Sequence, residues 1–126
     1  MHKEIIYTEN APAPIGPYSQ GVKAGGFLFL SGQIALDAKT GELVNADITA
    51  ETHQVMKNIL SLLTAANTTT ANIVKTTIFL SDMGLFAAVN EVYGSYFEND
   101  APARETVAVK GLPKNVNVEI SVTAFL

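Results

Sequence analysis

The stretch VNVEISVTAF, residues 116–125, decides the fold class. Hydrophobic and polar side chains alternate along it, with Val118, Ile120, Val122 and Ala124 in one set and Asn117, Glu119, Ser121 and Thr123 in the other. A two-residue period is that of a β-strand, because successive side chains point to opposite faces of a sheet. The stretch therefore predicts a strand with one face in a hydrophobic core. Its polar face is turned toward water or toward a subunit interface that contains a site.

The rest of the chain alternates between strand and helix patterns. Further strands are expected at 3–7, 18–24, 27–34, 72–80 and 105–109, with Gly25 and Gly26 as the turn of a hairpin. Apolar residues at helical spacing predict a first helix from Thr49, its expected N-cap, to Asn67. A second helix is expected after Asp82, with one face made by Phe86, Val89, Val92, Tyr93, Tyr96 and Phe97. This order predicts an α+β fold, with two helices packed on one face of a mixed or antiparallel sheet.

The composition indicates one domain, residues 1–126, that assembles with copies of itself. A chain of 126 residues can bury a single sizeable core. Charged residues make up 16% of it, against roughly 25% in an average soluble domain. A shortage of charge leaves apolar surface that needs a partner, so we expect an oligomer.

The charge pattern and the residue types exclude several function classes. The net charge is −4 with no block of like charges, which argues against nucleic-acid and anionic-membrane partners. The sequence has no cysteine, and His2 and His53 do not match a metal-ligand spacing, so no metal site is expected. No apolar signal region or membrane-spanning run is found, which makes the cytoplasm the simplest location.

Two catalytic motifs can be tested and set aside. The segment GPYSQGVK, residues 16–23, has Val22 where a phosphate-binding loop needs lysine, and it leads into an expected strand instead of a helix. Ser31 lacks the G-x-S-x-G context of a hydrolase nucleophile. Neither nucleotide binding nor serine-hydrolase chemistry is therefore predicted.

Four stretches carry a more specific signal together. They are APAPIGPYSQ at 11–20, LSGQIALD at 30–37, VNEVYGSYF at 89–97 and PARETVAVKGLPKNVNVEI at 102–120. In this order and spacing the chain resembles the reactive intermediate deaminase family (RidA, the YjgF/YER057c/UK114 group) over essentially its whole length. The resemblance implies a chorismate-mutase-like α+β fold and a homotrimer with active sites between subunits. It also implies cofactor-free hydrolysis of 2-imino or enamine acids to 2-oxo acids and ammonia.

The resemblance assigns two catalytic residues. It places the substrate carboxylate on Arg104, the only arginine of the chain, in APARETVAV at 101–109. A guanidinium offers a carboxylate two parallel donors, whereas an ammonium offers a point charge. Glu119 matches the acidic residue that positions the attacking water and manages its proton. From the residues alone, a surface ion pair for Arg104 and a wet strand face for Glu119 remain alternatives.

Further positions are implied for substrate binding, namely Tyr18, Ser31, Gly32, Asn90 and Thr106. A glycine at position 32 lets the backbone approach a ligand, although a strand bulge would also explain it. Thr106 departs from the family pattern, because many relatives have cysteine there. The threonine puts a thiol-based activity in doubt but leaves imine hydrolysis open.

Two other functions remain open at this stage. Members of the family have also been described as ribonucleases or translation inhibitors, but phosphate contacts need basic residues on one face, and the eight basic residues are dispersed. A non-catalytic sensor of 2-oxo acids would need Arg104 but not a proton-transferring Glu119.

Overall fold

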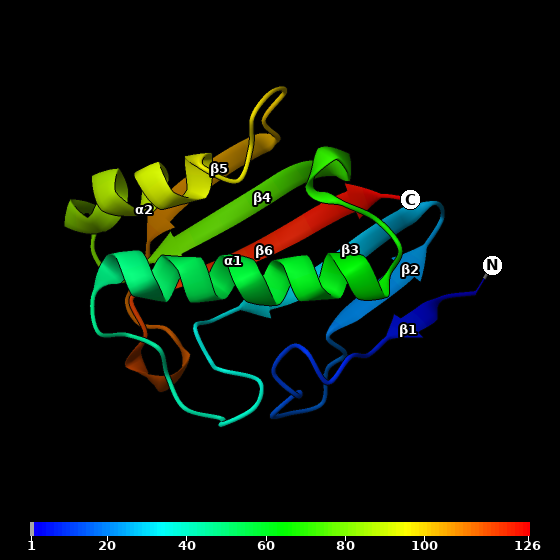
Figure 1. Cartoon of the computed structure of the whole chain (residues 1–126), viewed down its shortest axis with the longest axis horizontal. Coiled ribbons are helices and arrows are strands. Elements are labelled where there is room, and N and C mark those ends of the chain that lie inside the picture. The colour runs from blue at the N-terminus through cyan, green and yellow to red at the C-terminus, as the bar shows by residue number, and fades with distance from the viewer. Residues whose placement is uncertain (1) are drawn as a thin grey trace.

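The computed structural model describes residues 2–126, which form one sheet covered on one face by two helices (Figure 1). The strands are β1 (Glu4–Ile6), β2 (Gly21–Ala24), β3 (Phe27–Gln33), β4 (Ile73–Leu80), β5 (Ala103–Ala108) and β6 (Val118–Phe125). The helices are α1 (Ile48–Ala65) and α2 (Phe86–Gly94), with single 3₁₀ turns η1 (Thr70–Asn72), η2 (Met83–Leu85) and η3 (Pro113–Asn115). The α+β prediction with both helices on one face is therefore confirmed.

The six strands lie in the order β1-β2-β3-β6-β4-β5. Every neighbouring pair is antiparallel except β4 and β5, which are parallel and are connected through α2. The sheet is thus mixed, and β5 forms one of its edges. A parallel pair needs a crossover connection, and the helix that supplies it packs back on the sheet.

The alternation along β6 is borne out by burial. Val118, Ile120 and Ala124 are fully buried, and they pack with α1 residues such as Ile59 and Leu62 in the main hydrophobic core. The residues between them are only half-buried and lie on the opposite face, which neither helix covers. We call this the open face of the sheet. Burial of the core face is the dominant favourable contribution to folding.

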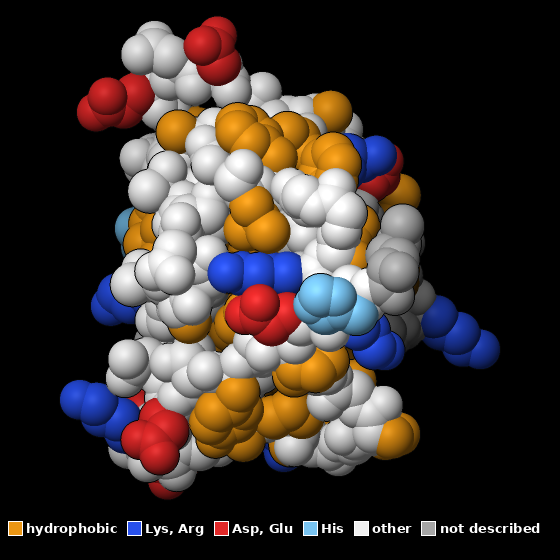
Figure 2. All heavy atoms as spheres, turned by 90° about the vertical axis from the view of Figure 1, so that its right-hand side faces the viewer, with side chains coloured by type: hydrophobic (Ala, Val, Ile, Leu, Met, Phe, Trp, Pro, Cys, Tyr) orange, Lys and Arg blue, Asp and Glu red, His pale blue; other side chains and the backbone are white. Residues whose placement is uncertain are grey.

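Large hydrophobic side chains remain exposed, as the low charge content predicts. They include Ile5, Tyr7, Phe27, Phe29, Val107, Phe125 and Leu126, each at least 43% exposed. Figure 2, which views the end of the sheet near both chain termini, shows several such hydrophobic patches between a few charged groups. This surface suits contact with a partner.

Three local predictions need comment. The hairpin turn is confirmed, since Gly25 and Gly26 have φ angles of 59° and 84°. The expected N-cap was wrong: α1 begins at Ile48, and the carboxylate of Asp47 accepts a hydrogen bond from the Ala50 amide at 2.7 Å. Thr49 already lies within the helix. Both residue types can cap a helix, and hydrophobic periodicity does not separate positions two residues apart.

The second helix also differs in its limits. Asp82 caps the 3₁₀ turn η2, which leads directly into α2, and α2 ends at Gly94. Tyr96 lies beyond it, and its hydroxyl is 2.7 Å from Nδ1 of His53 on α1. His53 is half-buried and connects α1 to the segment after α2.

The capping assignment makes a prediction for stability. Asp47→Ala should lower the free energy of unfolding by about 1 kcal/mol, because it removes an N-cap acceptor. Thr49→Ala should change it by less than about 0.5 kcal/mol, as expected for a surface position. Urea denaturation of the two variants would measure this difference. An equal loss in both would contradict the assignment of the cap to Asp47.

Candidate functional site

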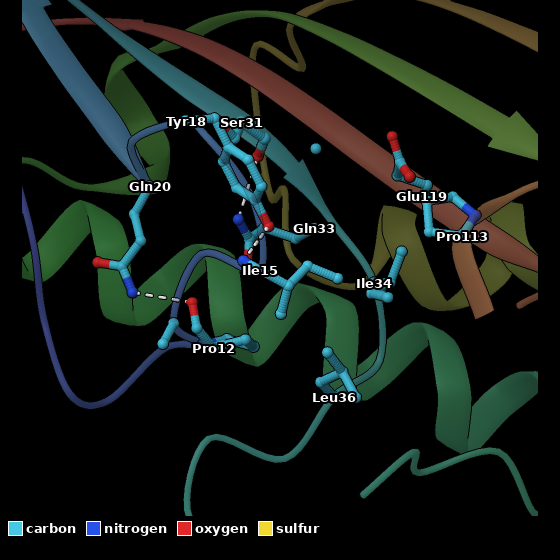
Figure 3. A pocket seen from close by; sticks show the side chains of 12 residues that line it. Pro12, Ile15, Tyr18, Gln20, Ser31, Gln33, Ile34, Leu36, Pro113 and Glu119 are labelled. Atoms are coloured by element: carbon cyan, nitrogen blue, oxygen red, sulfur yellow. Dashed lines mark hydrogen bonds between the residues drawn. The ribbon is translucent and has the colours of Figure 1, made fainter. Parts of the chain in front are cut away.

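The first cavity lies at the end of β3 and the start of β6 and has a volume of about 330 Å³. Its lining combines a polar end with an apolar wall (Figure 3). The residues are Pro12, Ala13, Ile15, Tyr18, Gln20, Ser31, Gly32, Gln33, Ile34, Leu36, Pro113 and Glu119. Four of the residues assigned from the sequence, Tyr18, Ser31, Gly32 and Glu119, therefore meet here. We call this the Glu119 cavity.

Glu119 supplies the titratable group of this cavity. Its register partner on β4 is Phe79, while the preceding residue on β4, Ile78, is buried in the core, so Glu119 stands on the open face. Among residues 2–126 the Glu119 carboxyl has no hydrogen bond and no ion pair. Burial raises the pKa of Glu119 above its ordinary value, because desolvation disfavours the charged form. A carboxyl in this state can bind and release a proton closer to neutral pH than an exposed one.

Gly32 allows the Glu119 carboxyl to take this position. A Cβ at residue 32 would lie 2.9 Å from Cδ of Glu119 and closer still to one carboxylate oxygen. Carbon atoms in contact are normally 3.5–4.0 Å apart. The register of β3 against β6 also shifts between Leu30 and Gln33, which marks a bulge here. The bulge is therefore present at Gly32, and the group that approaches its backbone is the Glu119 carboxyl, while approach of a ligand stays a prediction.

The other assigned residues of this cavity are held by main-chain groups. The Tyr18 hydroxyl accepts a hydrogen bond from the Ile15 amide at 3.2 Å. The Ser31 hydroxyl donates to the Ser19 carbonyl at 2.6 Å, so its oxygen can still accept a hydrogen bond from a ligand.

Gln20, which the sequence did not single out, organises the proline-rich wall. Its buried side-chain amide donates to the carbonyls of Thr8, Ala11 and Pro12, and its oxygen accepts from the Thr8 amide at 2.8 Å. These bonds replace those that a segment rich in proline cannot make within itself. A glutamine directly after a Pro-rich stretch was the only available signal, and it does not identify the carbonyls that the side chain reaches.

Arg104 lines a different cavity, of about 450 Å³, formed with Asn90, Tyr93, Gly94, Phe97, Ala101 and Pro102. We call it the Arg104 cavity. Nη1 of Arg104 donates to Oδ1 of Asn90 at 2.6 Å. The guanidinium also lies over the rings of Phe86 and Tyr93, at 5.6 and 5.2 Å from their centroids. Stacking and one hydrogen bond orient the guanidinium and leave four of its five N–H donors for a ligand.

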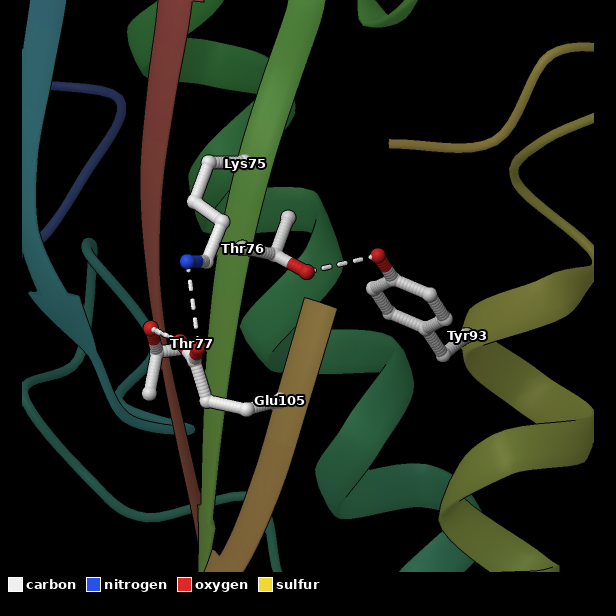
Figure 4. A network of polar contacts seen from close by, with 5 residues as sticks. All are labelled: Lys75, Thr76, Thr77, Tyr93 and Glu105. Atoms are coloured by element: carbon white, nitrogen blue, oxygen red, sulfur yellow. Dashed lines mark hydrogen bonds and ion pairs between the residues drawn. The ribbon is translucent and has the colours of Figure 1, made fainter. Parts of the chain in front are cut away.

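The two cavities lie on opposite faces of the sheet. Arg104 pairs with Thr76, whose hydroxyl is 2.7 Å from that of Tyr93 on α2, so Arg104 is on the helix-covered face. Figure 4 shows Thr76 pointing toward Tyr93, while Lys75 and Thr77 point to the other side of β4, where both contact Glu105. Glu119 is on that second side. A single chain therefore does not bring Arg104 and Glu119 into one cavity.

Thr106 lines neither of these two cavities. It pairs with the buried Ile78 in the parallel ladder, two residues beyond Arg104 on the same face. Its hydroxyl is buried and has no hydrogen-bond partner among residues 2–126. An unsatisfied buried hydroxyl is unfavourable, and a less polar side chain would avoid that penalty. The substrate-binding role that the resemblance implies for Thr106 remains a prediction.

The described residues contain no cluster of three or more side chains that could hold a metal ion. Across the same part of the chain, no helix is both long and apolar enough to span a membrane.

Comparison with known proteins identifies the family. The family model described as "Endoribonuclease L-PSP" matches residues 8–126. A RutC family protein of Pyrococcus horikoshii is 53% identical, with 98% of each chain covered. Reactive Intermediate Deaminase A of Arabidopsis thaliana, a chloroplastic protein, is 44% identical over 100% of this chain and 67% of its own length. AldR of Lactococcus lactis, named as a regulator, is 46% identical over 96% of both chains.

Solved structures agree with this assignment. A Rid family protein from Yersinia pestis superposes with a TM-score of 0.97 at 48% identity, covering 99% of this chain and 100% of its own. The structure of Escherichia coli TdcF with bound serine gives 0.93 at 39% identity, with 98% of each chain covered. The chain is thus an α+β protein with the Rid fold. It belongs to the YjgF/Rid family, as the four sequence stretches predicted.

The close approach of Gly32 to Glu119 can be tested by a double-mutant cycle. Gly32→Ala should destabilise the protein by about 1–3 kcal/mol, since the added methyl group overlaps the Glu119 carboxyl. In a Glu119→Ala background the loss should be smaller, because the overlapping group is absent. Gly111→Ala is the matched control, since an added Cβ there meets no atom within 4 Å. Equal losses in both backgrounds would argue against the contact.

Proposed function

We propose that this protein hydrolyses 2-imino acids, and the enamines in equilibrium with them, to 2-oxo acids and ammonia. The observation that carries the proposal is the Glu119 carboxyl, which is half-buried, has no hydrogen-bond partner among residues 2–126 and has a raised pKa. Such a group is suited to accept and return a proton. The deaminase name of the plant relative supports the same chemistry.

The reaction needs one carboxyl and one water molecule. Glu119 in its carboxylate form accepts a proton from water as the oxygen bonds to C2 of the imine. Glu119 then gives this proton to the imine nitrogen, so that C2 carries a hydroxyl and an NH2 group. The Glu119 carboxylate next takes the hydroxyl proton and delivers it to the NH2 group, and ammonia leaves as the C2–N bond breaks and the C2 carbonyl forms. The net change is imine plus water to ketone plus ammonia, with no redox step.

Arg104 supplies the binding half of the proposed site. It is the only cationic side chain lining either cavity, and its stacked guanidinium can take a substrate carboxylate in a two-point contact. The serine bound in the TdcF structure shows that a relative accepts an amino acid.

Because Arg104 and Glu119 lie on opposite faces, the proposal requires a second subunit. We propose a homotrimer in which the Glu119 cavity of one chain meets the Arg104 cavity of its neighbour. The exposed hydrophobic side chains of the sheet edge and the open face, such as Phe29 and Val107, would be covered by this assembly. The aromatic environment of Arg104 would then be enclosed, which strengthens its interaction with an anion.

Ribonuclease activity, suggested by the description of the family model, receives less support. Cleavage of RNA requires several cationic contacts to phosphates. With Arg104 as the sole cation lining the two cavities, small carboxylate ligands fit better than a polyanion.

The direct test of this function is release of ammonia from serine or threonine by a pyridoxal-phosphate-dependent dehydratase, with and without the protein. In that assay Glu119→Gln should reduce imine hydrolysis by at least 100-fold, since loss of a general acid or base typically costs roughly 10²–10⁴ in rate. Its affinity for 2-oxobutanoate, measured by calorimetry, should stay within a few-fold of wild type. Full hydrolysis by Glu119→Gln would show that water is activated elsewhere. Binding of 2-oxobutanoate by a wild-type protein that does not hydrolyse imines would favour a 2-oxo acid sensor. The name of AldR, a regulator, is compatible with that non-catalytic role.

Arg104→Lys should fail to restore the function of Arg104. Lysine keeps the charge but loses both the two-point contact and the stacking on Phe86 and Tyr93. Truncating one partner of a desolvated charge pair costs roughly 2–5 kcal/mol, so 2-oxobutanoate affinity should fall at least 30-fold in Arg104→Ala. Arg104→Lys should regain less than a tenth of the 2-oxobutanoate affinity that Arg104→Ala loses. Lys110→Ala, an exposed lysine outside both cavities, is the control. Equal affinity of Arg104→Lys and wild type would mean that charge alone suffices.

A further inference from the structure

The chain enters β6 through a turn with an unfavourable backbone. In η3 the residue Lys114 has φ 55° and ψ 24°, and the next residue, Asn115, also has φ 55°. Residues other than glycine avoid this left-handed region, because their Cβ approaches the following carbonyl oxygen. Two such residues in succession persist only where the surrounding structure holds them. Since Pro113 before them and Glu119 after them both line the Glu119 cavity, the turn sets the shape of the candidate site.

A buried carboxylate holds the end of this turn. Glu51, in the first turn of α1, is 1% exposed, and Oε2 accepts hydrogen bonds from the main-chain amides of Asn117 at 2.7 Å and Val118 at 3.3 Å. Its Oε1 accepts from the side-chain amide of Asn117 at 3.0 Å. Ser81 at the end of β4 holds Asn117 from another direction, by a 3.0 Å bond from its amide to the Asn117 carbonyl. Residues 117 and 118 are thus fixed directly before Glu119.

The same helix holds the opposite wall of the cavity. Asn58 is buried, and its side-chain amide donates to the carbonyls of Ile34 at 3.0 Å and Leu36 at 2.9 Å, two residues that line the Glu119 cavity. Glu51 and Asn58 are seven residues apart, which places them on one face of α1, two turns from each other. Helix α1 therefore connects the wall that carries Glu119 with the apolar wall across from it.

We infer that Glu51 is a positioning residue for the reaction, which acts by fixing the main chain that carries Glu119. The inference rests on the proposed function. The first turn of a helix favours a negative charge, so the carboxylate is stabilised where it is needed. Three donors satisfy it, as a buried charge requires. Without it, the Asn117 and Val118 amides lose their acceptor, and the turn can relax and carry the Glu119 carboxyl away from Gly32.

The test compares Glu51→Ala with two matched variants. Glu51→Gln keeps an oxygen for the two main-chain amides, although the Asn117 side-chain amide must rotate. Asp47→Ala weakens the same end of α1 but leaves the contacts of Glu51 intact. We expect Glu51→Ala to lower kcat/KM at least tenfold, mainly through kcat, and to speed hydrogen exchange at the Asn117 and Val118 amides at least tenfold. Glu51→Gln should stay within about threefold of wild type, and Asp47→Ala should leave kcat/KM and these two exchange rates unchanged while lowering the Tm.

The outcomes separate this inference from the proposed function. If the wild-type protein does not hydrolyse imines, the proposed function fails. The amide exchange rates and the carboxyl ¹³C shift of Glu119 in each variant still decide whether Glu51 positions the Glu119 carboxyl. Should Glu51→Ala not fold, Glu51→Asp, which withdraws the carboxylate by one methylene, takes its place with the same expectations. If Glu51→Ala, or Glu51→Asp in its place, has the same activity and the same amide exchange rates as Asp47→Ala, the inference is overturned, because Glu51 would then serve only helix stability.

Discussion

The two-residue period of the central strands is the constraint on which the rest of this structure depends. In β6 it sends Ile120 into the core beneath α1 and Glu119 to the open face. In β5 the parallel register with β4 places Arg104 on the helix side, beside Tyr93. A one-residue slip of β6 would exchange its faces and expose core residues such as Ile120, and a slip of β5 would turn Arg104 to the open face. The registers of these two strands therefore determine on which face each candidate catalytic group lies.

This constraint explains why the candidate site is divided. The fold can place a carboxyl in one cavity and a guanidinium in another, but the sheet itself separates them. A free chain with the two groups together would form an ion pair that competes with the substrate carboxylate. With the two groups on opposite faces, no acidic side chain among residues 2–126 pairs with Arg104. Its one side-chain hydrogen bond in this part of the chain is to the neutral amide of Asn90. In the proposed assembly the two groups would meet only at a subunit interface, with the substrate between them.

How much was predictable follows from the range of each interaction. Strands, helices and the Gly25-Gly26 hairpin follow from local periodicity and turn preference, and the structure confirms them. Arg104 and Glu119 could be singled out because the sequence stretches resemble a family. The resemblance implied sites between subunits, but the position of these two residues on opposite faces of one sheet could not be predicted, because it depends on register between strands far apart in the sequence. The roles of Gln20 and Asn58 were missed for a related reason. Each buried side-chain amide bonds to carbonyls of a loop, and no local sequence pattern indicates which carbonyls the loop brings near it.

Two glutamates of the chain show how the environment of a carboxyl decides between a structural role and a proton-transfer role. Glu51 and Glu119 are both removed from water, one almost completely and one by about half. Glu51 receives three hydrogen bonds from the segment that leads into β6, so its carboxylate is committed to the backbone. Glu119 receives none among residues 2–126, and burial alone raises its pKa. Desolvation without a hydrogen-bond partner favours uptake of a proton, and this is the environment of Glu119. A carboxyl that must exchange protons with a water and an amine needs the environment of Glu119. The hydrogen bonds of Glu51 to the amides of Asn117 and Val118, the two residues directly before Glu119, keep that carboxyl in place.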